Sequence, residues 1–263
     1  MNISGRTALV TGASGGLGQA IARALAGAGA QLVLSGRRGD VLEGLASELG
    51  AQVAPADLSD PDAVRSLAAA HADVDILVAN AGLPASGRLA SFSEEQIDRA
   101  LDVNLRAPMV LAHALAPAMA ARRSGHIVFM SSLAGKTAAA GTSVYSATKF
   151  GLRGFAGALR AELHGSGVGV SAIFPGFIRD AGMFEDADVT LPRGTGTKTP
   201  KQVAKATLRA IERNRGEIDV APVALKLGAA ISGIAPELAA TVTRKAGGDE
   251  VAAQFQAGQL DKR

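Results

Sequence analysis

The chain contains a single tyrosine, and a lysine follows it four residues later. Tyr145 and Lys149 lie at the start of a predicted helix, where residues four apart share one face, so the phenol and the ammonium can converge. Lowering the phenol pKa from about 10 to about 7 requires about 4 kcal/mol. One cation at about 4 Å supplies an interaction of that order. Tyr145 could therefore act as an acid and base near pH 7, although the spacing alone also fits a helix-surface pair.

Two further polar residues could act beside this pair. Ser132 ends a predicted strand thirteen residues before Tyr145, where its hydroxyl could hydrogen-bond a substrate oxygen as charge develops there. No histidine is placed to activate Ser132 as a nucleophile, which argues against a serine hydrolase. Asn104 shares a predicted helix face with Ile97 and Leu101, so we expect it to point inward and to find a polar partner. A strand-end turn and a satisfied core amide are the structural alternatives.

A glycine-rich segment follows the first predicted strand. Residues Thr11–Gly18 read TGASGGLG and open a helix. Glycine permits the tight turn and the close approach of the backbone, while the helix N-terminus supplies free N–H groups and a positive field for a phosphate. An ordinary strand–helix turn is the alternative, but the position after the first strand of an alternating chain favours a nucleotide site.

Other segments would complete a dinucleotide pocket. Arg37 and Arg38 follow the second strand, with no carboxylate before Asp40, and a planar guanidinium suits a ribose 2′-phosphate. We therefore expect NADP (NADPH) in preference to NAD, with a solvated surface pair as the alternative. Asp57 and Leu58 follow the third strand and could border the adenine or simply begin the next helix. After the fourth strand come small residues that would let a cofactor cross the sheet edge, Asn80, Ala81 and Gly82.

These residues need elements that bring them to one edge. Short apolar runs alternate with helical patterns, which predicts a doubly wound parallel α/β sheet of the Rossmann type, with ligands at the carboxyl ends of its strands. We expect strands over 7–11, 31–35, 52–54, 75–79, 126–131, 169–174 and 217–220. We expect helices over 16–29, 40–49, 61–70, 93–122, 143–164 and 200–214, and a long loop over 176–199.

Residues 221–263 form a predicted helical extension of the dinucleotide-binding and catalytic domain, which we assign to residues 1–220. An apolar stripe along the extension predicts one helical face, which Pro236 interrupts. We expect this face to pack on its own domain, and the alternatives are a subunit contact or a membrane-surface helix flanked by Lys226, Arg244 and Lys245. The stripe consists of Val223, Leu227, Ile231, Ile234 and Leu238.

Composition excludes several classes of protein. The 263 residues include no Cys and only four His, none spaced as a metal pair, so we expect no disulfide and no metal site. The hydrophobic content of 48% and charged content of 19% are typical of a globular chain. A net charge of +3 and 3% aromatic residues argue against nucleic-acid binding. With no signal-peptide pattern and no apolar run long enough to span a membrane, we expect a cytoplasmic protein.

Together, these motifs resemble the short-chain dehydrogenase/reductase family in its one-domain type. Each motif is modest alone, whereas the ordered set over about residues 5–220 is specific. The matching motifs are Thr-Gly-x-x-x-Gly-x-Gly at Thr11–Gly18, Asn-Ala-Gly at Asn80–Gly82, Asn104, Ser132, Tyr-x-x-x-Lys at Tyr145–Lys149, and Pro175-Gly176.

The resemblance implies hydride transfer between NADP(H) and a carbonyl or alcohol substrate, with a role for each matching residue. Tyr145 would be the general acid and base, and Ser132 would polarise the substrate oxygen. Lys149 would lower the Tyr145 pKa and bind the nicotinamide ribose, while Asn104 would hold a water in a proton relay. The implied cofactor-binding residues are Gly12, Ser14, Gly16, Leu17, Gly18, Arg37, Arg38, Asp57, Leu58, Asn80, Ala81, Gly82, Tyr145, Lys149, Pro175, Gly176 and Ile178.

The sequence departs from the family pattern after Gly176. Phe177 and Ile178 are followed by Arg179 and Asp180, where the family often has a threonine, which predicts a charged lid. The resemblance also implies a homodimer or homotetramer. An NADP-binding regulatory protein without turnover and a peripheral membrane protein are the alternative functions, and the identity of the substrate and the direction of reaction stay open.

Overall fold

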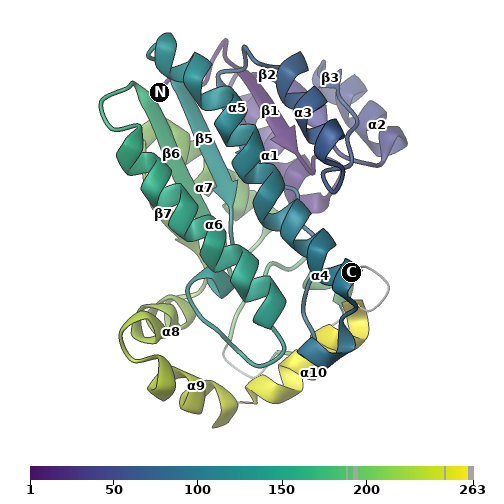
Figure 1. Ribbon diagram of the computed structural model, residues 1–263, viewed down its shortest axis with the longest axis vertical. Helices are drawn as coiled ribbons and strands as arrows, with labels where there is room; N and C mark the ends of the chain where they lie inside the picture. The colour runs from purple at the N-terminus through teal and green to yellow at the C-terminus, as the bar shows by residue number, and fades with distance from the viewer. Residues whose placement is uncertain (188, 192–194, 246, 260–263) are drawn as a thin grey trace.

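The computed structural model describes residues 1–187, 189–191, 195–245 and 247–259. Within these residues, seven parallel strands form one sheet in the order β3-β2-β1-β4-β5-β6-β7, with helices on both faces (Figure 1). This arrangement confirms the predicted doubly wound α/β fold. The strands are β1 (Thr7–Thr11), β2 (Gln31–Ser35), β3 (Gln52–Val53), β4 (Ile76–Ala79), β5 (Gly125–Met130), β6 (Val168–Pro175) and β7 (Glu217–Val220).

Two layers of helices bury the apolar residues of the strands. Helices α1, α2 and α7 cover one face, to which they contribute Ile21, Leu42 and Val203. Helices α3, α5 and α6 cover the other face, where α5 contributes Leu111 and α6 contributes Leu152. Strands covered on both faces read as continuous apolar runs, which is why the alternation in the sequence is informative. The helices are α1 (Gly16–Gly27), α2 (Gly39–Leu49), α3 (Pro61–Ala70), α4 (Glu94–Leu101), α5 (Ala107–Ala121), α6 (Ser143–Glu162) and α7 (Pro200–Arg213).

The predicted helix over 93–122 is interrupted. It begins as expected at a capping box between Ser93 and Gln96, but a π turn over Asp102–Arg106 separates α4 from α5. A π turn holds an extra residue, so the helix faces before and after it no longer align. Asn104 is fully buried while Leu101 is 36% exposed, and the predicted face shared by these two residues is therefore wrong.

The loop predicted over 176–199 crosses the carboxyl edge of the sheet. It contains a 3-10 turn, η4 (Glu185–Ala187), and one bridge from Ile178 to Lys198. Beyond β7, the chain forms α8 (Val223–Ile234), α9 (Pro236–Lys245) and α10 (Gly248–Gln259). Two other 3-10 turns are η1 (Leu89–Ser91) and η3 (Leu133–Gly135).

The predicted packing of the C-terminal stripe is wrong. Helix α8 contacts the domain core through Leu225 and Ala229, whereas the stripe from Val223 to Leu238 faces away from the domain. The spacing correctly identified one helical face, but α8 also has small residues on its opposite side that can approach the core closely. Among the described residues, no helix is both long enough and apolar enough to cross a membrane.

Candidate active site

A cleft of about 910 Å³ runs along the carboxyl ends of the strands. All of the residues expected to bind the cofactor line it, and Ser132 lies on the same wall as Tyr145 and Lys149. The expected cofactor-binding residues in the wall are Gly12, Ser14, Gly16, Leu17, Gly18, Arg37, Arg38, Asp57, Leu58, Asn80, Ala81, Gly82, Tyr145, Lys149, Pro175, Gly176 and Ile178.

The glycine turn after β1 is held against the end of β4. Gly12 has a φ of +64°, and a Cβ there would lie 2.7 Å from the Ala81 Cα, so only glycine fits. The Thr11 hydroxyl accepts the backbone N–H groups of Asn80 (3.1 Å) and Ala81 (3.2 Å), and the Asn80 amide donates back to the Thr11 carbonyl (3.1 Å). A side chain at Gly18 would overlap the Gly12 carbonyl oxygen. These contacts fix the turn that opens α1.

The two arginines after β2 lie at one end of the cleft. Arg38 donates a hydrogen bond to the Ser14 carbonyl and so braces the glycine turn, while the exposed Arg37 lines the cleft. Asp57 accepts hydrogen bonds from the Ser59 N–H (3.0 Å) and hydroxyl (2.8 Å), so it has the turn role considered from the sequence as well as a place in the wall. Burial acts to raise the pKa of Asp57, but the Ser59 hydrogen bonds and the Arg37 charge lower it below its ordinary value.

Ser132 and Tyr145 meet at the other end of the cleft. Ser132 caps η3, where its hydroxyl accepts the Ala134 N–H (3.1 Å) and lies 3.5 Å from the Pro175 carbonyl. The same hydroxyl lies close enough to the Tyr145 phenol to lower the pKa of that phenol. A strand-end serine and a helix tyrosine therefore line the same cleft, as the chemistry expected from the sequence requires.

Lys149 is buried next to this pair. Its ammonium donates to the Met130 carbonyl (3.1 Å) and lies 5.5 Å from the centre of the Tyr145 ring. Burial lowers the pKa of Lys149 to about 8 and raises the pKa of Tyr145 to about 12, the latter opposed by the Ser132 hydrogen bond. The predicted pKa near 7 for the phenol is therefore wrong for this geometry, because desolvation raises the phenol pKa by more than Ser132 lowers it.

Asn104 lies behind the cleft wall. Its Oδ1 accepts the Leu83 N–H (2.7 Å) and its Nδ2 donates to the Leu83 carbonyl (3.0 Å), which provides the polar partner expected for a buried amide. A Cβ at Gly82 would lie 3.3 Å from the Asn104 Oδ1 and 3.6 Å from the Lys149 Nζ. Gly82 therefore keeps open the space in front of Lys149.

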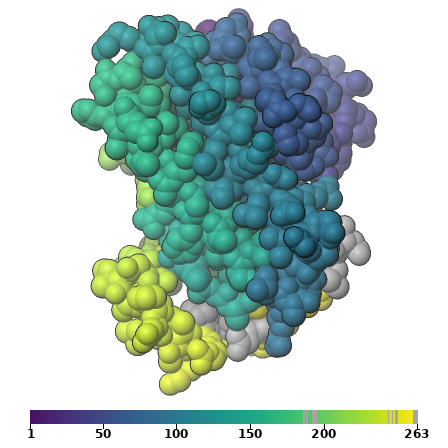
Figure 2. Space-filling model, viewed as in Figure 1, coloured from purple at the N-terminus to yellow at the C-terminus, as the bar shows by residue number. Residues whose placement is uncertain are grey.

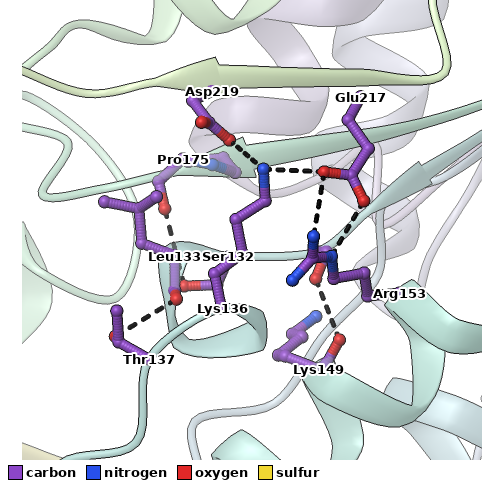
Figure 3. Close-up of polar contacts among 10 residues, drawn as sticks. Ser132, Leu133, Lys136, Thr137, Lys149, Arg153, Pro175, Glu217 and Asp219 are labelled. Atoms are coloured by element: carbon purple, nitrogen blue, oxygen red, sulfur yellow. Dashed lines mark hydrogen bonds and ion pairs between the residues drawn. The ribbon is translucent and has the colours of Figure 1, made fainter. Parts of the chain in front are cut away.

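A charged network that sequence reasoning missed supports the Ser132 segment (Figure 3). The Lys136 ammonium follows η3 and contacts the Asp219 Oδ1 (2.6 Å) and the Glu217 Oε2 (2.8 Å) on β7. Arg153 of α6 joins the same Glu217 carboxylate through its Nε (2.8 Å). Lys136 also lies 4.0 Å above the centre of the Phe174 ring. No motif signals these contacts, because they join residues as far as 83 positions apart.

The loop after β6 and α10 close one side of the cleft. Ala181 lies against Gly16, and Met183, Phe184 and Gln259 line the cavity. The Gln259 Nε2 donates to the Met183 carbonyl (3.2 Å), while its buried Oε1 has no hydrogen-bond partner among the described residues. No motif in the sequence pointed to Gln259, which lies at the end of α10.

The charges expected in this lid do not line the cleft. Arg179 and Asp180 are exposed and pair with each other, with 3.5 Å between the Nε and Oδ2 atoms. An aromatic cluster of Phe177, Phe184 and Phe255 instead joins the lid to α10, with ring centres 5.4 to 6.2 Å apart. The lid is thus held to α10 mainly by apolar contacts.

The parallel sheet, the glycine turn and the Ser–Tyr–Lys cluster in one cleft define a Rossmann-type oxidoreductase. The sequence model of the family described as short chain dehydrogenase matches residues 6–191. The chain belongs to the short-chain dehydrogenase/reductase family, whose members are NAD(P)-dependent dehydrogenases and reductases.

Similar proteins come from distant organisms. Over 230 residues the chain is 39% identical to the ketoacyl reductase HetN of Nostoc sp. (strain PCC 7120), covering 83% of this chain and 79% of that protein. Over 255 residues it is 33% identical to dehydrogenase/reductase SDR family member 7B of Bos taurus, covering 88% and 78%. A solved short-chain dehydrogenase from Sphingobium yanoikuyae in complex with NADPH matches with a TM-score of 0.77 and 31% identity, over 89% of this chain and 94% of that one.

Proposed function

We propose that the chain transfers hydride between NADP(H) and a carbonyl or alcohol substrate, with Tyr145 as the acid and base. The observation that carries this proposal is that Ser132, Tyr145 and Lys149 line the same cleft, with the buried Lys149 ammonium 5.5 Å from the centre of the Tyr145 ring. A protein that only sensed the nucleotide would have no need of this arrangement, and the NADPH-bound relative supports the cofactor class.

Each of these side chains has a separate task. The nicotinamide supplies or accepts the hydride when it is bound. Ser132 holds the substrate oxygen by a hydrogen bond, and Tyr145 donates its proton to that oxygen during reduction and recovers it during oxidation. The raised pKa of Tyr145 keeps the phenol protonated at neutral pH, so it is ready to act as an acid. The Lys149 cation stabilises the phenolate that forms when the proton leaves.

Asn104 acts behind this group. Its two hydrogen bonds fix the Leu83 backbone beside Gly82 and Lys149. The Oδ1 accepts one hydrogen bond from Leu83 and retains a second lone pair, which can hold the water of the proposed proton relay. We therefore assign Asn104 both a positioning role and a place in that relay.

The cleft fits a dinucleotide at both ends. Glycines at positions 12, 16 and 18 let the turn before α1 pack closely and line the cleft, where the N-terminus of α1 would meet a diphosphate, and Gly82 leaves space in front of Lys149 for a ribose. Arg37 supports the choice of NADP, because its guanidinium is exposed at the end of the cleft where the 2′-phosphate would lie.

The Arg37→Asp variant tests the cofactor choice. Losing a charge-assisted contact worth about 1.5–3 kcal/mol is expected to lower kcat/KM for NADPH by about 10- to 100-fold. The same change is expected to improve the use of NADH, since a carboxylate can bind the ribose 2′-hydroxyl. An unchanged preference for NADPH would reject the assignment of Arg37.

The Tyr145→Phe variant tests the reaction itself. A panel of carbonyls with NADPH and of alcohols with NADP, followed by cofactor absorbance, should show turnover by the wild type and a loss of about 10²- to 10⁴-fold in the variant. Cofactor binding by the variant, measured by quenching of NADPH fluorescence, should be retained and controls for folding. Equal activity of the two proteins would remove the proposed mechanism.

We also propose a homo-oligomer, as is typical of the family. Leu101 on α4 and Phe150 on α6 are large apolar side chains that are 36% and 42% exposed, and the two helices contact each other. An apolar patch shared by two packed helices can be buried by the same patch of a second subunit. Light scattering on the wild type and on Phe150→Ser would test this surface.

A further inference from the structure

The α8–α9 pair carries the largest group of exposed apolar side chains in the described part of the chain. Figure 1 shows the pair projecting from the body beyond β7, and Figure 2 shows it as a separate lobe. The other exposed large apolar side chains among the described residues are 36–59% exposed and lie outside this pair, on η1, α4 and α6. The exposed residues of the pair are Val223 (72%), Leu227 (59%), Ile231 (49%), Ile234 (88%), Leu238 (59%) and Val242 (58%).

These side chains form one outward face. Helix α8 is attached to the domain through its opposite face, where Leu225 and Ala229 contact the core. Exposed apolar residues stand on both sides of the corner between the two helices, because Ile234 ends α8 and Leu238 lies in the first turns of α9. A group of exposed apolar side chains on two adjoining helices, held in place by the domain behind it, is typical of an interaction surface.

The charged residues of α8 and α9 indicate which kind of partner would bind this surface. Lys226, Arg244 and Lys245 are cationic, and Glu237 is the one carboxylate between positions 223 and 245. Lys226 precedes the end of α8 by eight residues and Arg244 follows the start of α9 by eight, so both lie about 12 Å along their helices from the corner. An apolar corner with cations on both arms fits a bilayer surface, in which the corner enters the acyl boundary and the cations meet lipid phosphates.

A second copy of the chain fits this face less well. A twofold contact places the same patch on both subunits, so it would bring two arms of net positive charge together. We propose that the outward face of α8 and α9 binds the surface of a membrane containing anionic phospholipids. The proposal is independent of the reaction, because none of the six exposed apolar residues lines the cleft.

Vesicle flotation of the full chain tests the proposal. We expect binding to vesicles of phosphatidylcholine mixed with phosphatidylglycerol to exceed binding to pure phosphatidylcholine vesicles by about tenfold or more, and to weaken with added salt. The combined variant Ile231→Ser, Ile234→Ser and Leu238→Ser should lose at least about tenfold in partitioning, because each change removes apolar surface from the bilayer. Leu89→Ser is the matched control, since Leu89 is also 59% exposed but lies on η1, and it should bind like the wild type.

A charge variant separates the contribution of the cationic side chains from that of the apolar side chains. Lys226→Glu combined with Arg244→Glu and Lys245→Glu should remove the preference for anionic vesicles. Reductase activity on a water-soluble carbonyl should be unchanged in all these variants, which distinguishes failure of this proposal from failure of the proposed reaction. Failure of the wild type to float, or equal flotation of the triple serine variant, would overturn the proposal. A smaller oligomer formed by the triple serine variant, with no flotation of the wild type, would assign the face to a second copy.

Discussion

Replacing the buried ammonium by an isosteric apolar group, Lys149→Met, should make the protein more stable at neutral pH while abolishing turnover. The pKa of Lys149 in the folded chain is about 8, compared with about 10.5 in the unfolded chain. Between pH 8 and pH 10.5 the unfolded state therefore binds more protons than the folded state. The loss of stability caused by burying the Lys149 charge is complete below pH 8 and disappears as the pH rises above 10.5. At pH 7 the shift corresponds to about 3 kcal/mol.

The hydrogen bond to the Met130 carbonyl opposes this gain. Leaving that carbonyl without its donor costs about 1 kcal/mol, so Lys149→Met should raise the free energy of unfolding by about 2 kcal/mol at pH 7. At pH 10 the remaining charge penalty is about 1 kcal/mol, and the two proteins should be about equally stable.

Urea unfolding followed by circular dichroism at both pH values, at one protein concentration, measures this difference. The exposed Lys205→Met is the control and should show no such change with pH. A Lys149→Met variant that is less stable than the wild type at pH 7, or a difference that does not move with pH, would refute the reasoning.

Three further outcomes follow from other contacts. Burial lowers the pKa of His126 to about 3, so only the unfolded state takes up a proton at this residue as the pH falls below 6.5. The free energy of unfolding, measured by urea titration, should therefore drop by about 2 kcal/mol from pH 7 to pH 5. The drop should be smaller in His126→Gln. Lys136→Met should lower kcat by about tenfold, because it releases the Ser132 segment from β7, and KM for NADPH should be unchanged. Lys136→Arg should recover part of the lost kcat. A Lys136→Met variant with the kcat of the wild type would exclude a positioning role for Lys136. Gln259→Leu removes the unpartnered buried oxygen and also the hydrogen bond from Nε2 to the Met183 carbonyl, so thermal unfolding should show a stability within about 1 kcal/mol of the wild type. If that oxygen accepts a hydrogen bond from the bound molecule, kinetics should show KM raised by about tenfold.

Local patterns in the sequence determined the sheet and the cleft. Strands buried on both faces must be apolar throughout, and helices packed on them must repeat every three to four residues, so the alternation predicted every strand and helix of the sheet domain to within two residues except the long segment 93–122. The site residues could be located for a related reason. Parallel strands end at one edge, so residues that follow Thr11, Ala79, Met130 and Pro175 must lie near one another.

The π turn and the exposed stripe show where local pattern is insufficient. The extra residue of the π turn has no signature in the letters of 93–122, because tertiary contacts of Asn104 with Leu83 stabilise it. The stripe of α8 was visible as a helical face, but which face a helix turns to its domain depends on the shape of the surface it meets.

Tertiary structure alone decided the electrostatics of the site. The sequence placed Tyr145 and Lys149 on one helix face, and a Coulomb estimate from their spacing gave a phenol pKa near 7. Tyr145 packs beside Ala85 and Ala100, and Lys149 is buried against Met130 of β5, and this burial raises one pKa and lowers the other. The same packing brought Lys136 to Asp219 and Gln259 to Met183. Desolvation and long-range contacts depend on what surrounds a side chain in space, and no spacing along the chain encodes them.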